Sequence, residues 1–235
     1  MSAAAWRPAD EHAIGRSIMN DKEIRAWQLE CQAKDLIKKM EKRGFNAVYT
    51  PTAEEAKTAV LGLLPTEGVI ALLGSQTMNQ LGVYADLRTS GRELVDHATQ
   101  TKGLTPEEAH NYRRRAFTAE AMLASANAVD ADGRLYNIDG VGNRVASMIY
   151  GPNKVVLAIG MNKLAPTPEE AWRRARNTAS PMNNKRIDKP NPCVKSGRCH
   201  DCQLPSSICN YFTTIDRSLP EGRINVVLIG EEFGY

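Results

Sequence analysis

The chain has 235 residues, of which 42% are hydrophobic and 24% charged, and its net charge is +3. This is the composition of an ordinary globular protein, which excludes a disordered or fibrous chain and suits one α/β domain with a sizeable core. No apolar run approaches the roughly 20 residues of a membrane span, and the N-terminal residues lack an apolar signal core. We therefore expect a cytoplasmic protein with no membrane span and, at this low net charge, no nucleic-acid partner.

The predicted elements begin with a tail over residues 1–19, and residues 20–235 are expected to form one domain. Apolar spacing predicts an amphipathic helix over residues 21–43 that ends at Gly44, because glycine is favoured just after a helix. Cys31 lies beside the apolar stripe of this helix, so we expect it to be a small packing residue. Three further helices are expected after threonines that have a glutamate three residues later, the spacing of a capping box: Thr52, Thr105 and Thr167.

Four short runs are predicted to be strands: residues 45–49, 69–73, 155–159 and 226–229. The last three are rich in β-branched residues and lack polar alternation, which is typical of strands buried on both faces. Because such strands alternate with helices, the sequence predicts an α/β fold with a mostly parallel central sheet and helices on both faces.

The composition changes at Pro181. Residues 181–205 hold four of the 12 prolines and three cysteines but few aliphatic residues, which predicts an irregular, cysteine-rich loop within residues 181–210. A loop of this length in a compact domain is usually functional or disordered. The chain is then expected to return to the sheet through residues 224–229.

This loop contains a candidate metal site with the spacing Cys193-x5-Cys199-x2-Cys202-x6-Cys209. The Cys-x2-Cys pair directs two thiolates at one site, and the flanking cysteines complete a set of four. We favour an iron–sulfur cluster of the 4Fe-4S type, because such clusters are commonly held by one closely spaced run of cysteines. Zinc is the alternative, although four-cysteine zinc sites usually have two separated Cys-x2-Cys pairs. Unrelated buried thiols are a third interpretation.

Two cations and a histidine lie next to these cysteines in the sequence. Lys195 and Arg198 are expected to favour the thiolate forms and to offset the negative charge of a cluster. His200 lies between two candidate ligands and could replace a cysteine, although the simpler expectation is that it faces solvent.

Two glycine-containing segments are candidate ligand-binding turns. The first follows a predicted strand, where open α/β sheets bind ligands, and consists of Gly74, Ser75, Gln76 and Thr77. The second combines turn residues with basic side chains that could attract a carboxylate or phosphate: Asp139, Gly140, Gly142, Asn143, Arg144, Asn162 and Lys163. The simpler interpretations are a helix cap for the first segment and a hairpin for the second.

The ordered series of segments at 74–78, 137–145, 151–155 and 160–163 resembles the lactate utilization (LUD) family, in its LutC/YkgG-like part. The arginine-rich segment 173–186 and the closing residues 227–232 fit the same family. This resemblance implies a fold similar to the NagB/RpiA/CoA-transferase group. It also implies a link to bacterial oxidation of L-lactate to pyruvate, in which family members act with iron–sulfur oxidoreductase subunits as partners.

Two features distinguish this chain within the family. The cysteine-rich loop is shared by only part of the family and points to a redox subset. Where relatives usually have a glutamate after the Gly-Ser-x-Thr turn, this chain has Gln80, which cannot serve as a nucleophile or general base.

Three functional hypotheses follow. The first is a redox accessory or electron-transfer subunit that holds an iron–sulfur cluster and binds a small anionic metabolite. The second is an enzyme related to sugar-phosphate isomerases or CoA transferases, with a structural zinc site and with Asp139 as its acid–base candidate. The third is a regulatory module that binds a metabolite. The sequence assigns no catalytic residue, so it leaves open whether the protein is an enzyme.

Overall fold

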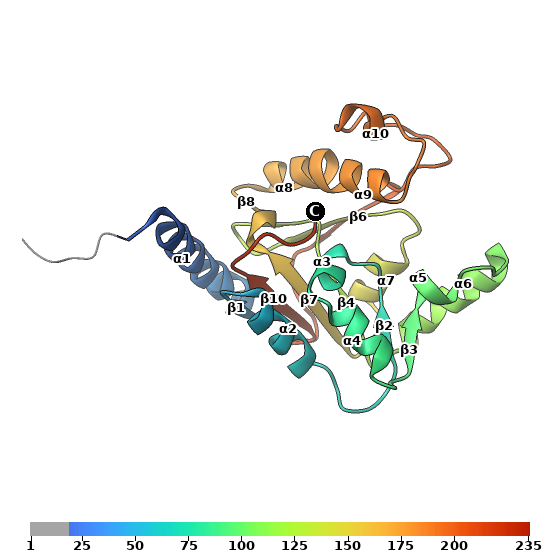
Figure 1. Ribbon diagram of the computed structural model, residues 1–235, viewed down its shortest axis with the longest axis horizontal. Helices are drawn as coiled ribbons and strands as arrows, with labels where there is room; N and C mark the ends of the chain where they lie inside the picture. The colour runs from blue at the N-terminus through green and yellow to red at the C-terminus, as the bar shows by residue number, and fades with distance from the viewer. Residues whose placement is uncertain (1–18) are drawn as a thin grey trace, which may run out of the picture.

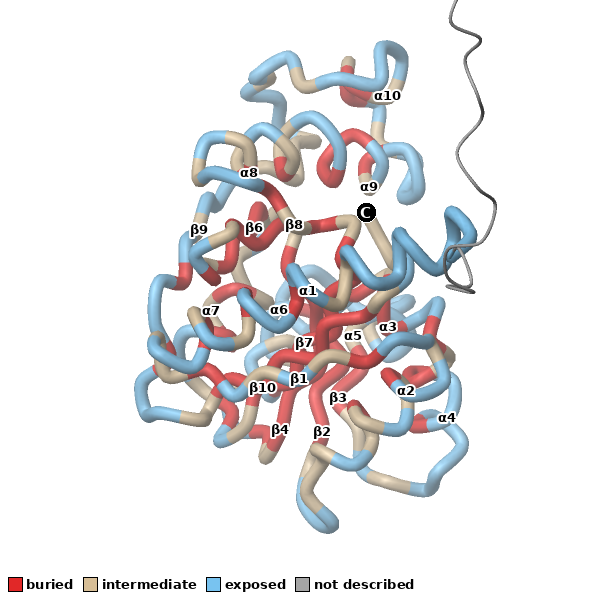
Figure 2. Tube along the Cα trace, turned by 90° about the vertical axis from the view of Figure 1, so that its left-hand side faces the viewer, coloured by how far each residue is buried: buried red, intermediate tan, exposed pale blue. Residues whose placement is uncertain are grey.

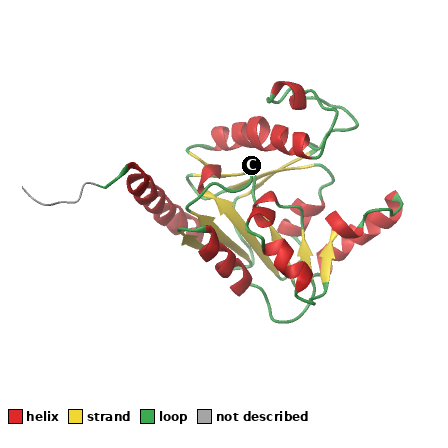
Figure 3. Ribbon diagram, in the orientation of Figure 1, coloured by secondary structure: helices red, strands yellow, loops and turns green. Residues whose placement is uncertain are grey.

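The computed structural model describes residues 19–235, so residues 1–18 of the predicted tail lie outside the described part. The described part holds a six-stranded sheet in the order β1-β10-β7-β4-β2-β3 and a four-stranded sheet in the order β8-β5-β6-β9. Every neighbouring pair in the six-stranded sheet is parallel. Figure 1 and Figure 3 show this sheet between helices. The prediction of an α/β fold with a mostly parallel central sheet is confirmed.

The six-stranded sheet contains the four predicted strands and two more, β3 and β4. The bounds in spatial order are β1 (Asn46–Thr50), β10 (Ile224–Ile229), β7 (Lys154–Gly160), β4 (Ala121–Ala124), β2 (Ile70–Leu72) and β3 (Leu94–Asp96). β2, β4 and β10 are buried along their whole length, and β7 is buried after its first residue. This burial on both faces explains why these runs lack polar alternation.

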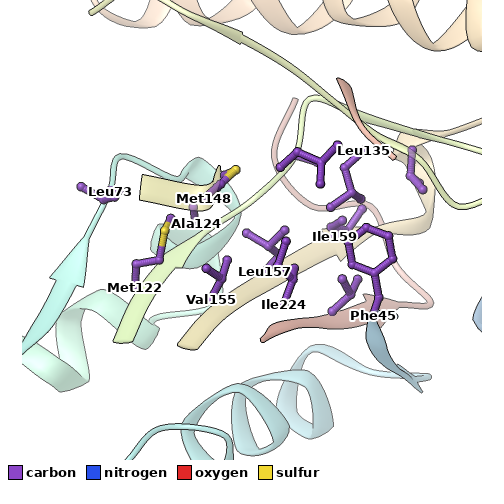
Figure 4. Close-up of a cluster of buried hydrophobic side chains, with 14 of the residues drawn as sticks. Phe45, Leu73, Met122, Ala124, Leu135, Met148, Val155, Leu157, Ile159 and Ile224 are labelled. Carbon is purple, nitrogen blue, oxygen red and sulfur yellow. The ribbon is translucent and has the colours of Figure 1, made fainter. Parts of the chain in front are cut away.

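Each face of the sheet has its own apolar core. On one face, α1 (Asp21–Lys42) and α7 (Asn143–Ile149) pack against the strands. On the other face, the apolar contacts come from α2 (Ala53–Gly62), α3 (Gln76–Gln80) and α4 (Val83–Thr89). Figure 2 shows the strands buried at the centre of the molecule, and Figure 4 shows Leu157 of β7 in the first core with Phe45 and Met148.

The three predicted helix starts are confirmed. Thr52, Thr105 and Thr167 are the N-caps of α2, α6 (Pro106–Arg114) and α8 (Pro168–Arg174), and each hydroxyl accepts from the N–H of the glutamate three residues later. At α6 the capping box is complete, because the Glu108 carboxylate accepts from the Thr105 backbone N–H at 2.8 Å. At α8 the Glu170 carboxylate pairs with Arg173 instead of with the Thr167 backbone N–H. The spacing there therefore predicts the N-cap but not the complete capping box.

The apolar stripe of α1 is buried as predicted, at Ala33, Leu36 and Met40. Cys31 is exposed, however, so the packing role expected for it is wrong. A residue two positions before Ala33 points to a different side of an α-helix, because helical neighbours on one face are three or four positions apart. Neither α1 nor any other helix within residues 19–235 is long and apolar enough to cross a membrane.

The four-stranded sheet is not evident from the sequence. Its strands are β8 (Leu164–Ala165), β5 (Ala128–Asp130), β6 (Leu135–Asp139) and β9 (Tyr211–Ile215). β5 and β6 form a hairpin in which the Asp130 carboxylate accepts from the Arg134 N–H at 2.9 Å and from the Tyr136 hydroxyl at 2.8 Å. The hairpin expected after Asp139 is wrong, because β6 ends there and α7 begins at Asn143, so the glycine turn joins a strand to a helix.

A layer of helices lies beyond the carboxyl ends of the central strands (Figure 1). Within it, α8, a π-helical turn (Ala175–Ala179) and α9 (Ser180–Arg186) follow one another without a break. The irregular loop expected from Pro181 is therefore wrong for its first residues. Pro181 is tolerated in α9 because the preceding π turn already interrupts the regular hydrogen-bond pattern. The irregular chain follows α9 and contains the short helix α10 (Cys193–Ser196).

Gly160 ends β7 at the place where the C-terminal segment folds back across it. A Cβ atom at Gly160 would lie 2.7 Å from the backbone nitrogen of Phe233, so the backbone would have to move. We expect Gly160→Ala to lower the free energy of unfolding by about 1–3 kcal/mol, as measured by urea denaturation.

Gly62→Ala is the matched control, because a Cβ at the last residue of α2 meets nothing within 4 Å. This substitution should leave the free energy of unfolding unchanged or raise it by up to about 1 kcal/mol. Equal destabilisation by the two variants would contradict the close packing described at Gly160.

Candidate functional site

The carboxyl ends of four neighbouring strands surround a pocket of about 320 Å³. Residues 74–77 follow β2, His97 follows β3, residues 125–127 follow β4, and Lys163 ends the short 3-10 helix η2 (Met161–Lys163) that follows β7. β2 and β4 are adjacent, yet the chain leaves β2 towards β3 and leaves β4 towards β7 on the opposite side. Such a reversal opens a crevice at the carboxyl ends of the strands, where α/β proteins bind ligands.

Most of the predicted ligand-binding residues line this pocket: Gly74, Ser75, Gln76, Thr77, Asp139, Gly140, Asn143, Arg144 and Lys163. Two of the predicted residues lie elsewhere. Gly142 lies beside Tyr211 in a neighbouring groove, and the Asn162 Oδ1 accepts from the Phe233 N–H at 3.2 Å. The two glycine-containing segments, far apart in the sequence, thus meet at one place.

Lys163 is almost fully buried in the wall of this pocket, with 2% of its surface exposed. Its Nζ donates to Thr77 Oγ1 at 2.9 Å, to Ser125 Oγ at 3.0 Å and to the Ala126 carbonyl at 3.3 Å. Within residues 19–235, no carboxylate pairs with it. Burial, and to a lesser degree the charges of Arg174 and Arg144, lowers the pKa of Lys163 from 10.5 to about 7.

This lowered pKa predicts a pH dependence of stability. Between pH 7 and pH 10.5 the folded lysine has released a proton that the unfolded lysine still holds, so raising the pH favours the folded state. The free energy of unfolding should rise across this window by up to about 1.4 kcal/mol per pH unit. Urea denaturation at several pH values should show this rise for the wild type and its loss in Lys163→Met. Parallel pH profiles for the two proteins would contradict the prediction.

Arg144 is held firmly by the protein. Its N–H groups face five oxygen atoms: the carbonyls of Ser125 at 3.0 Å and Ile138 at 2.9 Å, the Oδ1 atoms of Asn137 at 2.6 Å and Asn127 at 3.4 Å, and Asp139 Oδ2 at 3.4 Å. The N–H groups of the two terminal nitrogens donate to the first four of these oxygens, and Nε faces Asp139 in an ion pair, so no donor of Arg144 is directed at a ligand. Arg144 therefore contributes its positive charge to the pocket, while its donors fix the strand ends and the turn that surround it.

The two carboxylate oxygens of Asp139 differ in their hydrogen bonds. Its Oδ1 accepts from the backbone N–H groups of Val141 at 3.2 Å and Gly142 at 2.9 Å, which holds the turn into α7. Its Oδ2 is buried and accepts no hydrogen bond from the described residues, although it forms an ion pair with Arg144. A buried carboxylate oxygen without a donor is costly, so this atom is suited to a ligand proton.

His97 is another acid–base group that lines the pocket, besides Lys163 and Asp139. Its Nδ1 lies 3.2 Å from the Leu72 carbonyl, which can only accept, so this ring nitrogen carries the proton. The other nitrogen, Nε2, faces the turn at Gly74. Burial lowers the pKa of His97 below its ordinary value of 6.5, which leaves Nε2 unprotonated at neutral pH.

The four predicted metal ligands, Cys193, Cys199, Cys202 and Cys209, line a second cavity. Figure 1 shows α10 and its flanking chain on the far side of α9 from the central sheet. Ile138 and Ser180 line both this cavity and the larger pocket, so the two are adjacent. The structure thus brings together a cysteine cluster and ligand turns that the sequence leaves apart.

The surroundings of the thiols differ in part from those expected. Lys195 and Arg198 are exposed, and the cation that reaches a thiol is Arg176, whose Nη2 lies 3.8 Å from Cys199 Sγ. His200 is also exposed, in agreement with the simpler expectation that it faces solvent, although it borders the cavity. Burial raises the pKa of the Cys193 and Cys209 thiols.

The four cysteines line the cavity, but the structure does not place them as a site for a single metal ion. In the part of the chain that the structure describes, no group of three or more His, Cys, Asp or Glu side chains could hold a metal ion as placed. This arrangement differs from a compact single-ion site, in which all ligands point at one centre.

A family model described as the LUD domain matches residues 33–229 of the chain. The chain belongs to the LUD domain family. This family is linked to lactate utilization. No curated protein matches the chain.

Two solved structures are similar to this LUD domain protein. A DUF162 family protein from Deinococcus radiodurans is 14% identical, with a TM-score of 0.45, and the match covers 87% of this chain and 97% of that one. The eIF2B delta protein from Chaetomium thermophilum is 12% identical, with a TM-score of 0.31, and the match covers 61% of this chain and 54% of that one.

Several residues that line the LUD domain pocket were not predicted: His97, Ser125, Asn127, Ser180, Asn183, Arg186 and Tyr235. His97 and Ser125 directly follow β3 and β4, so a correct prediction of these short strands would have found them by the carboxyl-end rule. The α9 residues had no such signal, because this segment was expected to be an irregular loop. Gln80 does not line the pocket; its Oε1 accepts from the Gly234 N–H at 2.6 Å and so holds the C-terminal segment.

Proposed function

We propose that this LUD domain protein is an iron–sulfur-binding accessory or subunit of an oxidoreductase that binds lactate or a related small hydroxy acid beside its cluster. The observation that carries this proposal is that the four-cysteine cavity and the larger pocket share Ile138 and Ser180 as lining residues. At this separation a bound anion and a cluster would act on each other through their charges. The family link to lactate utilization supports the choice of a small hydroxy acid.

The residues around the cysteine cavity fit an iron–sulfur cluster. Four thiols are the usual ligand set of such a cluster, and each thiolate binds a separate iron atom. All four cysteines line one cavity, as the ligands of a single cluster would. Arg176 beside Cys199 would offset part of the negative charge of the ligands. A bound cluster would supply a carrier of single electrons.

The larger pocket fits a small anion. Arg144 and Arg186 line the pocket and Arg174 acts on Lys163 from nearby, whereas the Asp139 carboxylate opposes this positive charge. An excess of positive charge in a partly enclosed pocket favours an anionic ligand. His97 Nε2 is an unprotonated nitrogen in the same pocket and is suited to accept a hydrogen bond from the hydroxyl group of a hydroxy acid.

A redox titration with and without the acid tests this proposal. The protein purified under argon should show a midpoint potential that falls when L-lactate or pyruvate is added, because a bound anion opposes the gain of a negative charge nearby. The titration should be followed by visible absorption and repeated with sodium chloride at the same ionic strength. An identical potential in all conditions, at saturating concentrations of either acid, would contradict the proposal.

A further inference from the structure

The proposed function assigns no chemical role to the amine of Lys163. Lys163 lines the pocket, and the three hydrogen-bond partners of its Nζ atom are the hydroxyls of Thr77 and Ser125 and one carbonyl. A buried lysine that serves only as a structural cation is normally paired with a carboxylate. No described carboxylate pairs with this one, and two arginines oppose its charge. A desolvated amine beside other cations is instead the usual setting of a nucleophilic lysine.

We propose that Lys163 forms an imine with the carbonyl carbon of a small 2-oxo acid bound in the pocket. This inference rests on the proposed carboxylate-binding pocket and is independent of the cysteine site. Its substrate class is the oxidation product of the proposed hydroxy-acid ligand. The pocket volume of about 320 Å³ is suited to a metabolite of this size.

Imine formation needs no oxidant or reductant. The lone pair of Nζ forms the new C–N bond, and the electron pair of the carbonyl double bond moves to its oxygen. The C–O bond then breaks, and the two amine protons leave with that oxygen as water. The Thr77 and Ser125 hydroxyls contact Nζ and lie 3.4 Å from each other, so they provide a path for these protons. Burial and nearby positive charge keep a large fraction of the amine neutral near pH 7.

Arg186 is suited to hold the carboxylate of the 2-oxo acid. It lies on α9 in the wall of the same pocket, and its Nε and Nη2 both donate to the Asn183 side chain, at 3.1 and 2.7 Å. The structure gives no acceptor among the described residues for Nη1. Unlike Arg144, whose donors all face protein oxygens, Arg186 is exposed and can turn towards a ligand.

Reductive trapping tests the inference on the full-length protein. Pyruvate is added with sodium cyanoborohydride, which reduces imines, and the labelled residue is located by peptide mass spectrometry. We expect the reduced adduct on Lys163 ahead of all other lysines, at a rate that rises with pH through about 7, as the amine loses its proton. Arg186→Ala should slow the labelling by about tenfold, because a charged contact to the carboxylate is lost.

Lys163→Arg should remove the adduct, and Lys154→Arg, at the start of β7, should retain it. Labelling spread over surface lysines of the wild type would overturn the inference, and this readout does not depend on whether a variant folds. Calorimetry with pyruvate separates the two proposals. Binding of pyruvate without an adduct on Lys163 overturns the imine alone, whereas no binding also contradicts the carboxylate pocket.

Discussion

Replacing Cys202 with serine is expected to lower the iron and acid-labile sulfide bound per chain by about tenfold or more, because a serine hydroxyl does not readily ionise to bind the metal. Cys202 lines the cavity with the other three cysteines of the predicted site. The measurement is iron and sulfide analysis of protein purified under argon, together with its visible absorption. Serine differs from cysteine by one atom, so the change leaves the size of the side chain nearly unaltered.

Cys31→Ser is the control for this experiment. Cys31 is a free cysteine exposed on α1, which packs on the central sheet and not on α9 or α10. The variant should retain the full amount of iron and sulfide. If Cys202→Ser retained as much iron as Cys31→Ser, the four cysteines could not be the ligand set that we propose.

Replacing Arg144 with methionine should lower the free energy of unfolding by about 3–5 kcal/mol, the range for removing one partner of a buried ion pair. The loss would leave Asp139 without its counter-charge and the carbonyls of Ser125 and Ile138 without donors. A methionine side chain fills similar space but supplies no N–H group. Urea denaturation measures the effect.

Arg173→Ala provides the comparison for Arg144→Met. Arg173 lies on α8 with 68% of its side chain exposed and pairs with Glu170 on the same helix. Its removal should change the free energy of unfolding by no more than about 0.5 kcal/mol. Similar small effects of the two substitutions would contradict the structural role assigned to Arg144.

The elements that could be predicted from the sequence are those with strong local signals. Thr105 and Glu108 marked a helix start because the capping interactions lie within four residues. The apolar run of β10 marked a buried strand because every residue in it is buried. β9 could not be found in this way, because it is mostly exposed and is held by its pairing with β6, which is distant in the sequence.

The candidate sites show the same limit. The glycine turn at Gly74 and the cysteine spacing are local patterns, and the sequence was sufficient to single them out. The two sites are adjacent because Ser180 of α9 lines both. The prolines and polar residues of this segment predicted a loop, so the helix was not expected. The lowered pKa of Lys163 likewise depends on burial beside Thr77 of α3 and Ser125 after β4, which no local pattern reveals.

In the proposed function, the four cysteines hold an iron–sulfur cluster beside the ligand pocket. The most direct test is to purify the full-length protein under argon and to measure iron, acid-labile sulfide and zinc per chain. We expect a brown protein with iron and sulfide in similar amounts and with little zinc. A colourless protein with one zinc ion per chain would contradict this expectation and would favour a structural metal site.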